Sequence, residues 1–362
     1  MSLEYESLRS AVEEAAAIRR VQRLQPAGGP GDKVFPPTYP GDGDNAPPRY
    51  VFETRRIGGQ DVRCVLLDSV QSQANRLEEA LLAAVRDGRI HMPYIAVDFS
   101  DQKYPIGSDT IEIADLGEIT SLDAPHRVFD AIIRDSELDG RPFTQTDHYR
   151  KLVTAKPTNA LPVFELSPNS LLFGAWNSTG QGGGLGARFA RCIVSEIVGV
   201  GASEAERRAV RIDPLGIRKD VKVVVRSPID WRVAKEGDKN SKEEKIKRPS
   251  EINHSNIPAP SGPGGVTIDY ALHTVVITCA GLRRLRFPND DIKDEAAGRA
   301  VLAALALVAL LEQDAHGYAL RSRCDLVPQG EAPFEIVQSD GSVHTFTISK
   351  EQAISLFRQA VE

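Results

Sequence analysis

This 362-residue sequence lacks several features that would place it quickly in a functional class. Its four cysteines (Cys64, Cys192, Cys279 and Cys324) stand far apart without a CxxC pair, which argues against structural zinc and for reduced thiols in a cytoplasm. Its longest apolar run, Ala300 to Leu311, is about half the length that a bilayer span needs. The first residues carry acids where a secretory signal would carry cations, so we expect no export signal and no membrane partner.

Catalytic motifs are also scarce. The seven histidines are scattered, and no GxSxG, HExxH or paired-carboxylate pattern is present. A lone histidine in a strand, such as His273, is expected to pack rather than to react. We therefore expect no cofactor and no metal site.

Charge is unevenly distributed along the chain. The net charge of −6 does not by itself indicate a nucleic-acid partner, but binding depends on where cations cluster. Residues 207–232 hold eight Lys/Arg against three Asp, whereas the acids gather in the N-terminal segment and between Asp98 and Asp139. The chain therefore has one strongly basic stretch.

Hydrophobic periodicity and turn residues predict an irregular mixture of helices and strands. The sequence favours a helix over about Leu3 to Leu24, then a Pro/Gly-rich loop over 26–50. Further elements are a hairpin over 50–69 around Gly58-Gly59, helices over 69–88, 294–314 and 350–361, and strands over 90–99, 188–200, 220–233 and 265–288. This irregular order favours an α+β fold over a doubly wound α/β sheet.

The stretch FGAWNSTGQGGGLGARFARC, residues 173–192, is the most unusual part of the sequence. A Walker loop is rejected because no Lys or Ser follows the glycines. Gly182, Gly184 and Ala187 fit the dinucleotide pattern GxGxx[G/A], but no strand leads directly into them and no helix follows. Two interpretations stay open, a flexible glycine turn and a loop that lets a polymer's phosphates approach backbone N–H groups, with Arg188 and Arg191 behind it.

Four segments together resemble a known family. SVQSQANRLEEAL, LLFGAWNSTGQGGGLGARFAR, PSEINHSNIP and GLRRLRFP are similar, in this order, to the backbone RAMP subunit of the type I-G (formerly I-U) CRISPR Cascade complex. The resemblance implies a modified RRM-like (ferredoxin-like) palm with a finger-like insertion near 99–160 and a thumb-like or mobile insertion near 233–265. Within the second insertion, 235–248 has a single Ile and is expected to be mobile until it meets its partners.

The resemblance also implies a function. Several copies would stack along the CRISPR RNA in the cytoplasm, beside other Cascade subunits, and hold it for pairing with target DNA, without catalysis by this subunit. The residues that it implies as RNA contacts lie inside the four matching segments: Gln71, Asn75, Arg76, Asn177, Gln181, Gly182, Gly183, Gly184, Arg188, Asn253, His254, Asn256, Arg283 and Arg284.

The sequence is poor in the aromatic residues that many RNA-binding domains use to stack bases. GLGARFARCIV does not fit the aromatic pattern of an RRM that stacks bases on its sheet, and aromatics make up only 6% of the chain. Backbone contacts are therefore expected to dominate. The competing hypothesis is a metal-dependent ribonuclease of the RAMP superfamily, with Asp98 or Asp101 as its acid.

Overall fold

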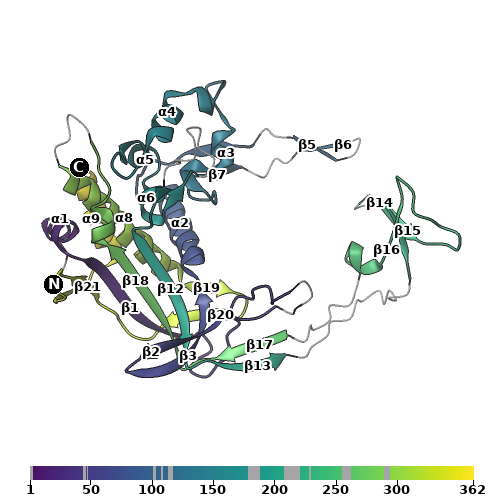
Figure 1. Ribbon diagram of the computed structural model, residues 1–362, viewed down its shortest axis with the longest axis horizontal. Coiled ribbons are helices and arrows are strands. Elements are labelled where there is room, and N and C mark those ends of the chain that lie inside the picture. Colours follow the sequence, from purple (N-terminus) through teal and green to yellow (C-terminus); the bar gives the residue numbers. More distant parts are fainter. Residues whose placement is uncertain are drawn as a thin grey trace.

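A large, curled antiparallel sheet forms the centre of the fold in this computed structural model (Figure 1). The structure describes residues 3–43, 46, 48–100, 103–106, 109–112, 117–177, 188–207, 221–227, 230–254, 262–288 and 294–362. The main path of the sheet runs β19 (Tyr318–Arg321), β20 (Cys324–Pro328), β1 (Ala17–Pro26), β18 (Tyr270–Thr278), β12 (Ile193–Val200), β3 (Gln60–Asp68) and β2 (Phe52–Ile57). β21 (Phe334–Val337) also pairs with β1, and β22 (Val343–Phe346) pairs with β21.

The central strands share a simple topology. β1 and β12 are each antiparallel to β18, which lies between them, so β1 and β12 are parallel to each other. On its other side β1 pairs with β21 along its first residues and with β20 along its last. The chain passes through helix α2 (Val70–Arg86) between β1 and β12, and through α8 (Glu295–His316) between β18 and β20. The predicted α+β class is confirmed.

Helices pack together on one side of the sheet. α8 contacts α1 (Tyr5–Glu14), α2 and α9 (Lys350–Val361), and its Ala- and Leu-rich sequence is buried around most of its circumference. The carboxylate of Asp294 accepts hydrogen bonds from the first backbone N–H groups, and the helix stops at Gly317, where φ is +85°. The buried core helix is therefore confirmed. Among the helices that the structure describes, none combines the length and apolarity needed to cross a bilayer.

The predicted N-terminal helix is wrong beyond its first three turns. α1 ends at Glu14, and the backbone N–H of Ala16 donates to Val337 in the sheet at 2.8 Å. The following residues alternate between buried and more exposed, with Ile18 and Leu24 on the buried side. The sequence did not reveal this two-residue period, because the polar residues Arg20 and Gln22 occupy two of the buried positions, where apolar residues are expected.

The hairpin and the helix after it are confirmed. β2 and β3 are joined by Gly58 and Gly59, whose φ angles of +59° and +82° suit a two-residue hairpin turn. α2 begins after Ser69, whose hydroxyl accepts the N–H of Ser72 at 3.3 Å. It ends before Gly88, where φ is +69°. The Pro/Gly-rich segment before the hairpin has no helix among its described residues, and Val34 bridges to Val266.

A lobe of short elements follows α2 (Figure 1). Its strands are β4 (Ala96–Asp98), β5 (Lys103–Ile106), β6 (Asp109–Glu112), β7 (Glu118–Thr120), β8 (Glu137–Leu138) and β9 (Arg141–Pro142). Its helices are η1 (Arg127–Phe129), α3 (Ala131–Arg134), η2 (Phe143–Gln145), α4 (Asp147–Thr154), α5 (Leu161–Leu166) and α6 (Pro168–Phe173). The strand predicted over 90–99 is thus only three residues long. The lobe contains the segment predicted as a finger-like insertion.

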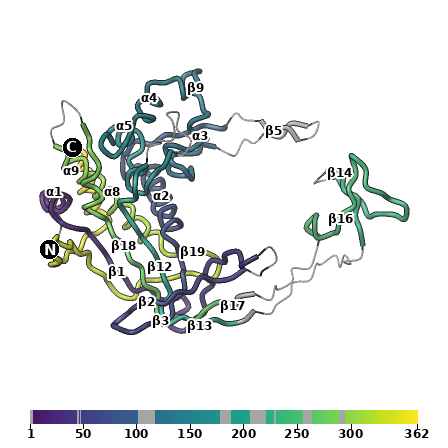
Figure 2. The backbone as a smooth tube through the Cα atoms, in the orientation of Figure 1, coloured from purple at the N-terminus to yellow at the C-terminus, as the bar shows by residue number. Residues whose placement is uncertain are grey.

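A small three-stranded sheet stands away from the main body (Figure 2). It consists of β14 (Val223–Ser227), β15 (Asp230–Val233) and β16 (Lys245–Lys247), followed by η3 (Pro249–Ile252). The ribbon of β13 (Ser203–Arg207) and β17 (Gly262–Thr267) extends from the main sheet toward it. The segment predicted to be mobile, 235–248, thus contains a strand, and ion pairs from Arg226 to Glu244 and from Arg232 to Asp238, each at 2.7 Å, join it to β14 and β15.

The four cysteines are buried and form no disulfide. Burial raises the pKa of Cys192 to about 12 and the pKa values of Cys279 and Cys324 to about 11. Their thiols therefore stay protonated near neutral pH.

A chain of buried hydrogen bonds joins the sheet to the helices. The ring of His273 on β18 has Nε2 at 2.8 Å from the Ser195 hydroxyl and Nδ1 at 3.2 Å from the Tyr318 hydroxyl. Tyr318 donates to Asp314, which pairs with Arg20. Ser195 in turn donates to Oε1 of Gln73 at 2.8 Å, so the chain continues to α2. Complete burial, with Arg20 nearby, lowers the pKa of His273 to about 3.

This buried histidine predicts an acid sensitivity of the fold. The unfolded chain binds a proton at His273 below about pH 6.5, whereas the folded chain stays neutral down to about pH 3. Above pH 6.5 the burial of neutral His273 costs the fold no stability through protonation. As the pH falls from about 6.5 to about 3, protonation of this histidine in the unfolded chain lowers the free energy of unfolding by up to about 1.4 kcal/mol per pH unit. Urea titrations of the wild type and of His273→Gln should show a steeper loss of unfolding free energy in the wild type between about pH 6 and 5.

His316→Gln, at an exposed position at the end of α8, controls for the removal of one imidazole. Parallel curves for the wild type and His273→Gln would contradict a neutral, buried His273.

Candidate nucleic-acid interface

The first turns of α2 present polar side chains beside a positively charged centre. Gln71 and Asn75, four residues apart on one face of the helix, are exposed. Arg76 lies beside them, one quarter exposed, and its Nε donates to Asp68 at 2.9 Å. The helix N-terminus adds a partial positive charge at the same place.

Asp68 is the hub of this centre. Its fully buried carboxylate accepts hydrogen bonds from Ser72 at 2.8 Å, Gln73 at 2.7 Å, and Arg76 and Arg321 at 2.9 Å each. The two guanidinium groups also donate to the carbonyl oxygens of Leu320 and Leu67, respectively. One negative carboxylate is thus paired with two positive guanidinium groups, so this group of three side chains keeps a net positive charge.

The stem of the glycine-rich loop is a pair of two-residue strands. β10 (Ala175–Trp176) pairs with β11 (Arg188–Phe189), so that Trp176 lies opposite Arg188. Arg188 is exposed, and Asn177, which follows Trp176 in the chain, is half-buried. Gln181, Gly182, Gly183 and Gly184 lie outside the described residues.

A buried ion pair fixes this stem against α2. Arg127 donates from Nε and Nη2 to the carboxylate of Glu78 on α2, at 2.7 and 2.6 Å, and from Nη1 to the carbonyl of Gly174 at 2.9 Å. Asn169 donates to the same carboxylate at 2.9 Å. Burial raises the pKa of Glu78, and Arg127 opposes that rise.

These contacts place the stem next to the exposed row on α2. Asn75 is three residues before Glu78 and Gln71 seven residues before it, so all three follow one side of the helix. Arg191 strengthens the junction by donating from Nε to the carbonyl of Phe173 at 3.1 Å, and burial lowers its pKa. Helix α2 thus carries Gln71, Asn75 and Arg76, and its Glu78 is joined through Arg127 to Gly174, three residues before Asn177.

Arg283 and Arg284 lie elsewhere, at the end of the short helix α7 (Cys279–Leu282). Arg283 donates to the carbonyl oxygens of Val12 and Ala15, at 3.0 and 2.8 Å, where α1 ends. Its guanidinium is therefore used to close a helix. Arg284 is exposed, and its charge reaches Cys192 at the start of β12 and opposes the rise in that thiol's pKa.

Asn253 and His254 belong to the small sheet. Asn253 has a φ of +62° and ends η3, and the ring of His254 lies 5.0 Å from that of Trp231. The small sheet stands apart from α2 (Figure 2). Asn256 lies outside the described residues. The predicted contacts thus fall in three separate places.

Sequence reasoning missed several residues of the first place: Glu78, Arg127, Trp176 and Arg321. Only Glu78 carried a clear signal, because it is an acid on the apolar face that Ala74, Leu77 and Leu81 define. The others join through contacts distant in sequence.

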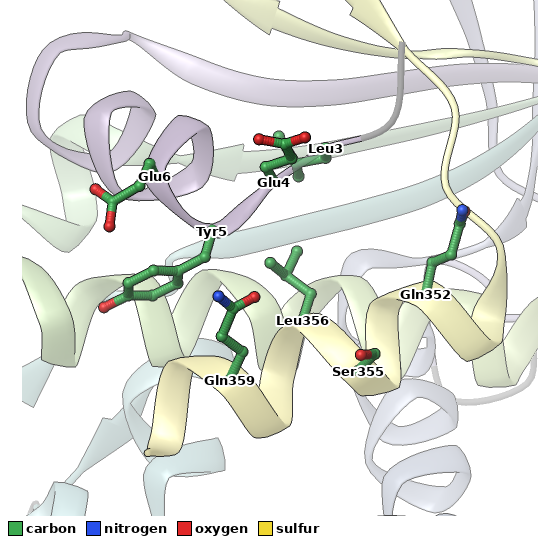
Figure 3. A pocket seen from close by; sticks show the side chains of 8 residues that line it. All are labelled: Leu3, Glu4, Tyr5, Glu6, Gln352, Ser355, Leu356 and Gln359. Atoms are coloured by element: carbon green, nitrogen blue, oxygen red, sulfur yellow. The ribbon is translucent and has the colours of Figure 1, made fainter.

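A pocket between α1 and α9 differs from this site in its charge (Figure 3). Its volume is about 370 Å³, and its lining includes Glu4, Glu6, Gln352 and Gln359 but no cation. A phosphate backbone would be repelled there.

The residues of the competing catalytic hypothesis are partly described. Asp98 is exposed at the end of β4, and the N–H of Ser100 donates to it at 2.9 Å, which lowers its pKa. Asp101 lies outside the described residues. In the part of the chain that the structure describes, no three His, Cys, Asp or Glu side chains gather as a metal site would require. Ser195 and His273 are adjacent but are only 2% and 0% exposed, so that a substrate could not reach them.

Comparison with known proteins identifies the family. Residues 18–204, just over half of the chain, match the family model described as CRISPR-associated protein GSU0053. The chain belongs to this CRISPR-associated family. Membership in the GSU0053 family gives the chain a role in CRISPR defence, and the matched segment contains α2 and both strands of the loop stem. No functionally curated protein matches the sequence.

The position of the stem depends on Gly174, so we expect a substitution at this residue to destabilise the fold. Its φ of +84° is a conformation that L residues rarely adopt, and an added Cβ would lie 2.9 Å from Cγ of Arg191. Gly174→Ala should lower the free energy of unfolding by about 2 kcal/mol or more, measured by urea denaturation.

Gly140→Ala is the matched control, because Gly140 has a φ of +71° but open space around it. Its loss should be about 1 kcal/mol, from backbone strain alone. Equal losses at both positions would show that the contact with Arg191 is unimportant.

Proposed function

We propose that this chain is a non-catalytic CRISPR RNA-binding backbone subunit of a type I-G Cascade complex in the cytoplasm. Several copies assemble along the guide RNA, beside other Cascade subunits, and present it for pairing with target DNA. The observation that carries the proposal is the junction of the polar row on α2 with the stem of the glycine-rich loop through Glu78, Arg127 and Gly174. A phosphate backbone that follows this row meets Arg76 and Arg321 at one end and Arg188 at the other.

The topology of the sheet supports an RRM-like (ferredoxin-like) palm. The strand order β20–β1–β18–β12, with α2 and α8 as crossovers, is that of two interleaved split βαβ units. In this proposal the lobe after α2 corresponds to the fingers and the small sheet to the thumb. Both project from the body, as elements that reach along an extended ligand would (Figure 1).

The chemistry of the junction favours recognition of the RNA backbone. Arginine and amide side chains donate to phosphate and sugar oxygens, which every nucleotide carries. A scaffold built in this way accepts any guide sequence.

Binding should therefore be tolerant of sequence and sensitive to salt. Two single-stranded RNAs of equal length, one the scramble of the other, should bind with the same affinity. Between about 50 and 200 mM salt that affinity should fall about threefold for each phosphate that the chain neutralises, because counterions are released. Filter binding at several salt concentrations measures both properties. A strong preference for one RNA, or a flat salt response, would contradict backbone recognition.

The same proposal expects no cleavage by this subunit. Asp98→Ala and Asp101→Ala should leave the RNA and DNA products of the assembled complex unchanged, on gels run with and without magnesium. If either variant abolished a magnesium-dependent cut, the ribonuclease hypothesis would replace this one.

A further inference from the structure

Trp176 is much more exposed to solvent than is usual for a side chain with so large an apolar surface. Its side chain is 58% exposed, and it is the only aromatic among the strongly exposed large apolar side chains of the described residues. Tryptophan carries the largest apolar surface of any side chain and is usually mostly buried. An indole left in solvent on a structured element indicates a surface kept for a ligand.

The strand that carries this ring is anchored through its neighbouring residues. Its neighbour on the strand, Ala175, is buried, and Phe189, opposite Ala175, is stacked on Phe129 with 6.4 Å between ring centroids. The carbonyl of Gly174, directly before this strand, accepts the hydrogen bond from Arg127. The indole therefore projects from a rigid base, which lowers the entropy lost on binding.

A cation lies over one face of the ring. The guanidinium carbon of Arg188 is 6.0 Å from the centroid of Trp176, at the outer limit of a cation–π contact. With more than half of its surface exposed, the ring still has an open face. An aromatic face beside an exposed guanidinium fits one nucleotide, with the base on the ring and the phosphate on the cation.

We propose that Trp176 is a stacking platform for one unpaired base of the bound RNA, and that Arg188 contacts the phosphate of that nucleotide. This inference rests on the proposed function and adds to it a specific contact in each copy. Every base has a π face, so a single stack of this kind keeps binding tolerant of sequence. It also agrees with the low aromatic content of the chain, since one ring per copy is enough.

The test uses the full chain with Trp231→Phe, which leaves Trp176 as its only tryptophan. Single-stranded RNA should quench the fluorescence of this chain, and heparin, a polyanion without bases, should bind without quenching it. Trp176→Ala should weaken RNA binding about tenfold or more, since one stacked base is worth roughly one to two decades of affinity. Trp176→Phe should retain most of the affinity, and heparin binding should be the same in all three chains.

Val361→Ala is the matched control, because Val361 is equally exposed and lies at the end of α9. Its RNA affinity should equal that of the wild type. RNA binding without quenching, together with full affinity of Trp176→Ala, overturns the stacking platform and leaves the proposed function intact. A blue shift of Trp176 emission on self-association without RNA would assign the ring to a protein contact and also overturn it. If the wild type binds no RNA, both proposals fail.

Discussion

The carboxylate of Glu78 lies where water cannot reach it, and a buried ion requires a partner of opposite charge. Arg127 meets this requirement from the lobe that follows α2, and its third nitrogen reaches the carbonyl of Gly174. Helix, lobe and loop stem are therefore held as one unit. Removal of one partner from such a pair typically costs about 3–5 kcal/mol, so the arrangement around α2 is closely constrained. Asp68 does the same at the start of the helix, where it fixes Arg76 and Arg321.

The candidate contacts occupy three separate places, and this separation bears on the kind of ligand. The α2 junction, the end of α7 and the small sheet could not surround one small molecule. They could contact successive parts of a polymer, or two neighbouring subunits on one strand. Arg283 is an exception among them, since its guanidinium closes α1. The acidic pocket between α1 and α9 lies outside this set and has the wrong charge for RNA.

Local patterns predicted the elements that have strong local signals. α2, α8, α9 and the β2–β3 hairpin were found because their apolar period, caps and glycines agree with one another. β1 was misread as helix because buried Arg20 and Gln22 broke its apolar alternation, and Asp314, which pairs with Arg20, lies far away in the sequence. The site followed the same rule. Gln71, Asn75 and Arg188 stood in recognisable segments, whereas Arg127 and Arg321 join the site only through the fold.

The burial of all four thiols has a practical consequence. At neutral pH each is protonated and shielded from solvent, and the reactive form of cysteine is the exposed thiolate. A cysteine introduced on the surface would therefore react with a maleimide far faster than any native one. The native thiols therefore need no replacement before labelling, and two cysteines introduced on the small sheet and on α9 would carry a pair of dyes that reports how these parts move relative to each other.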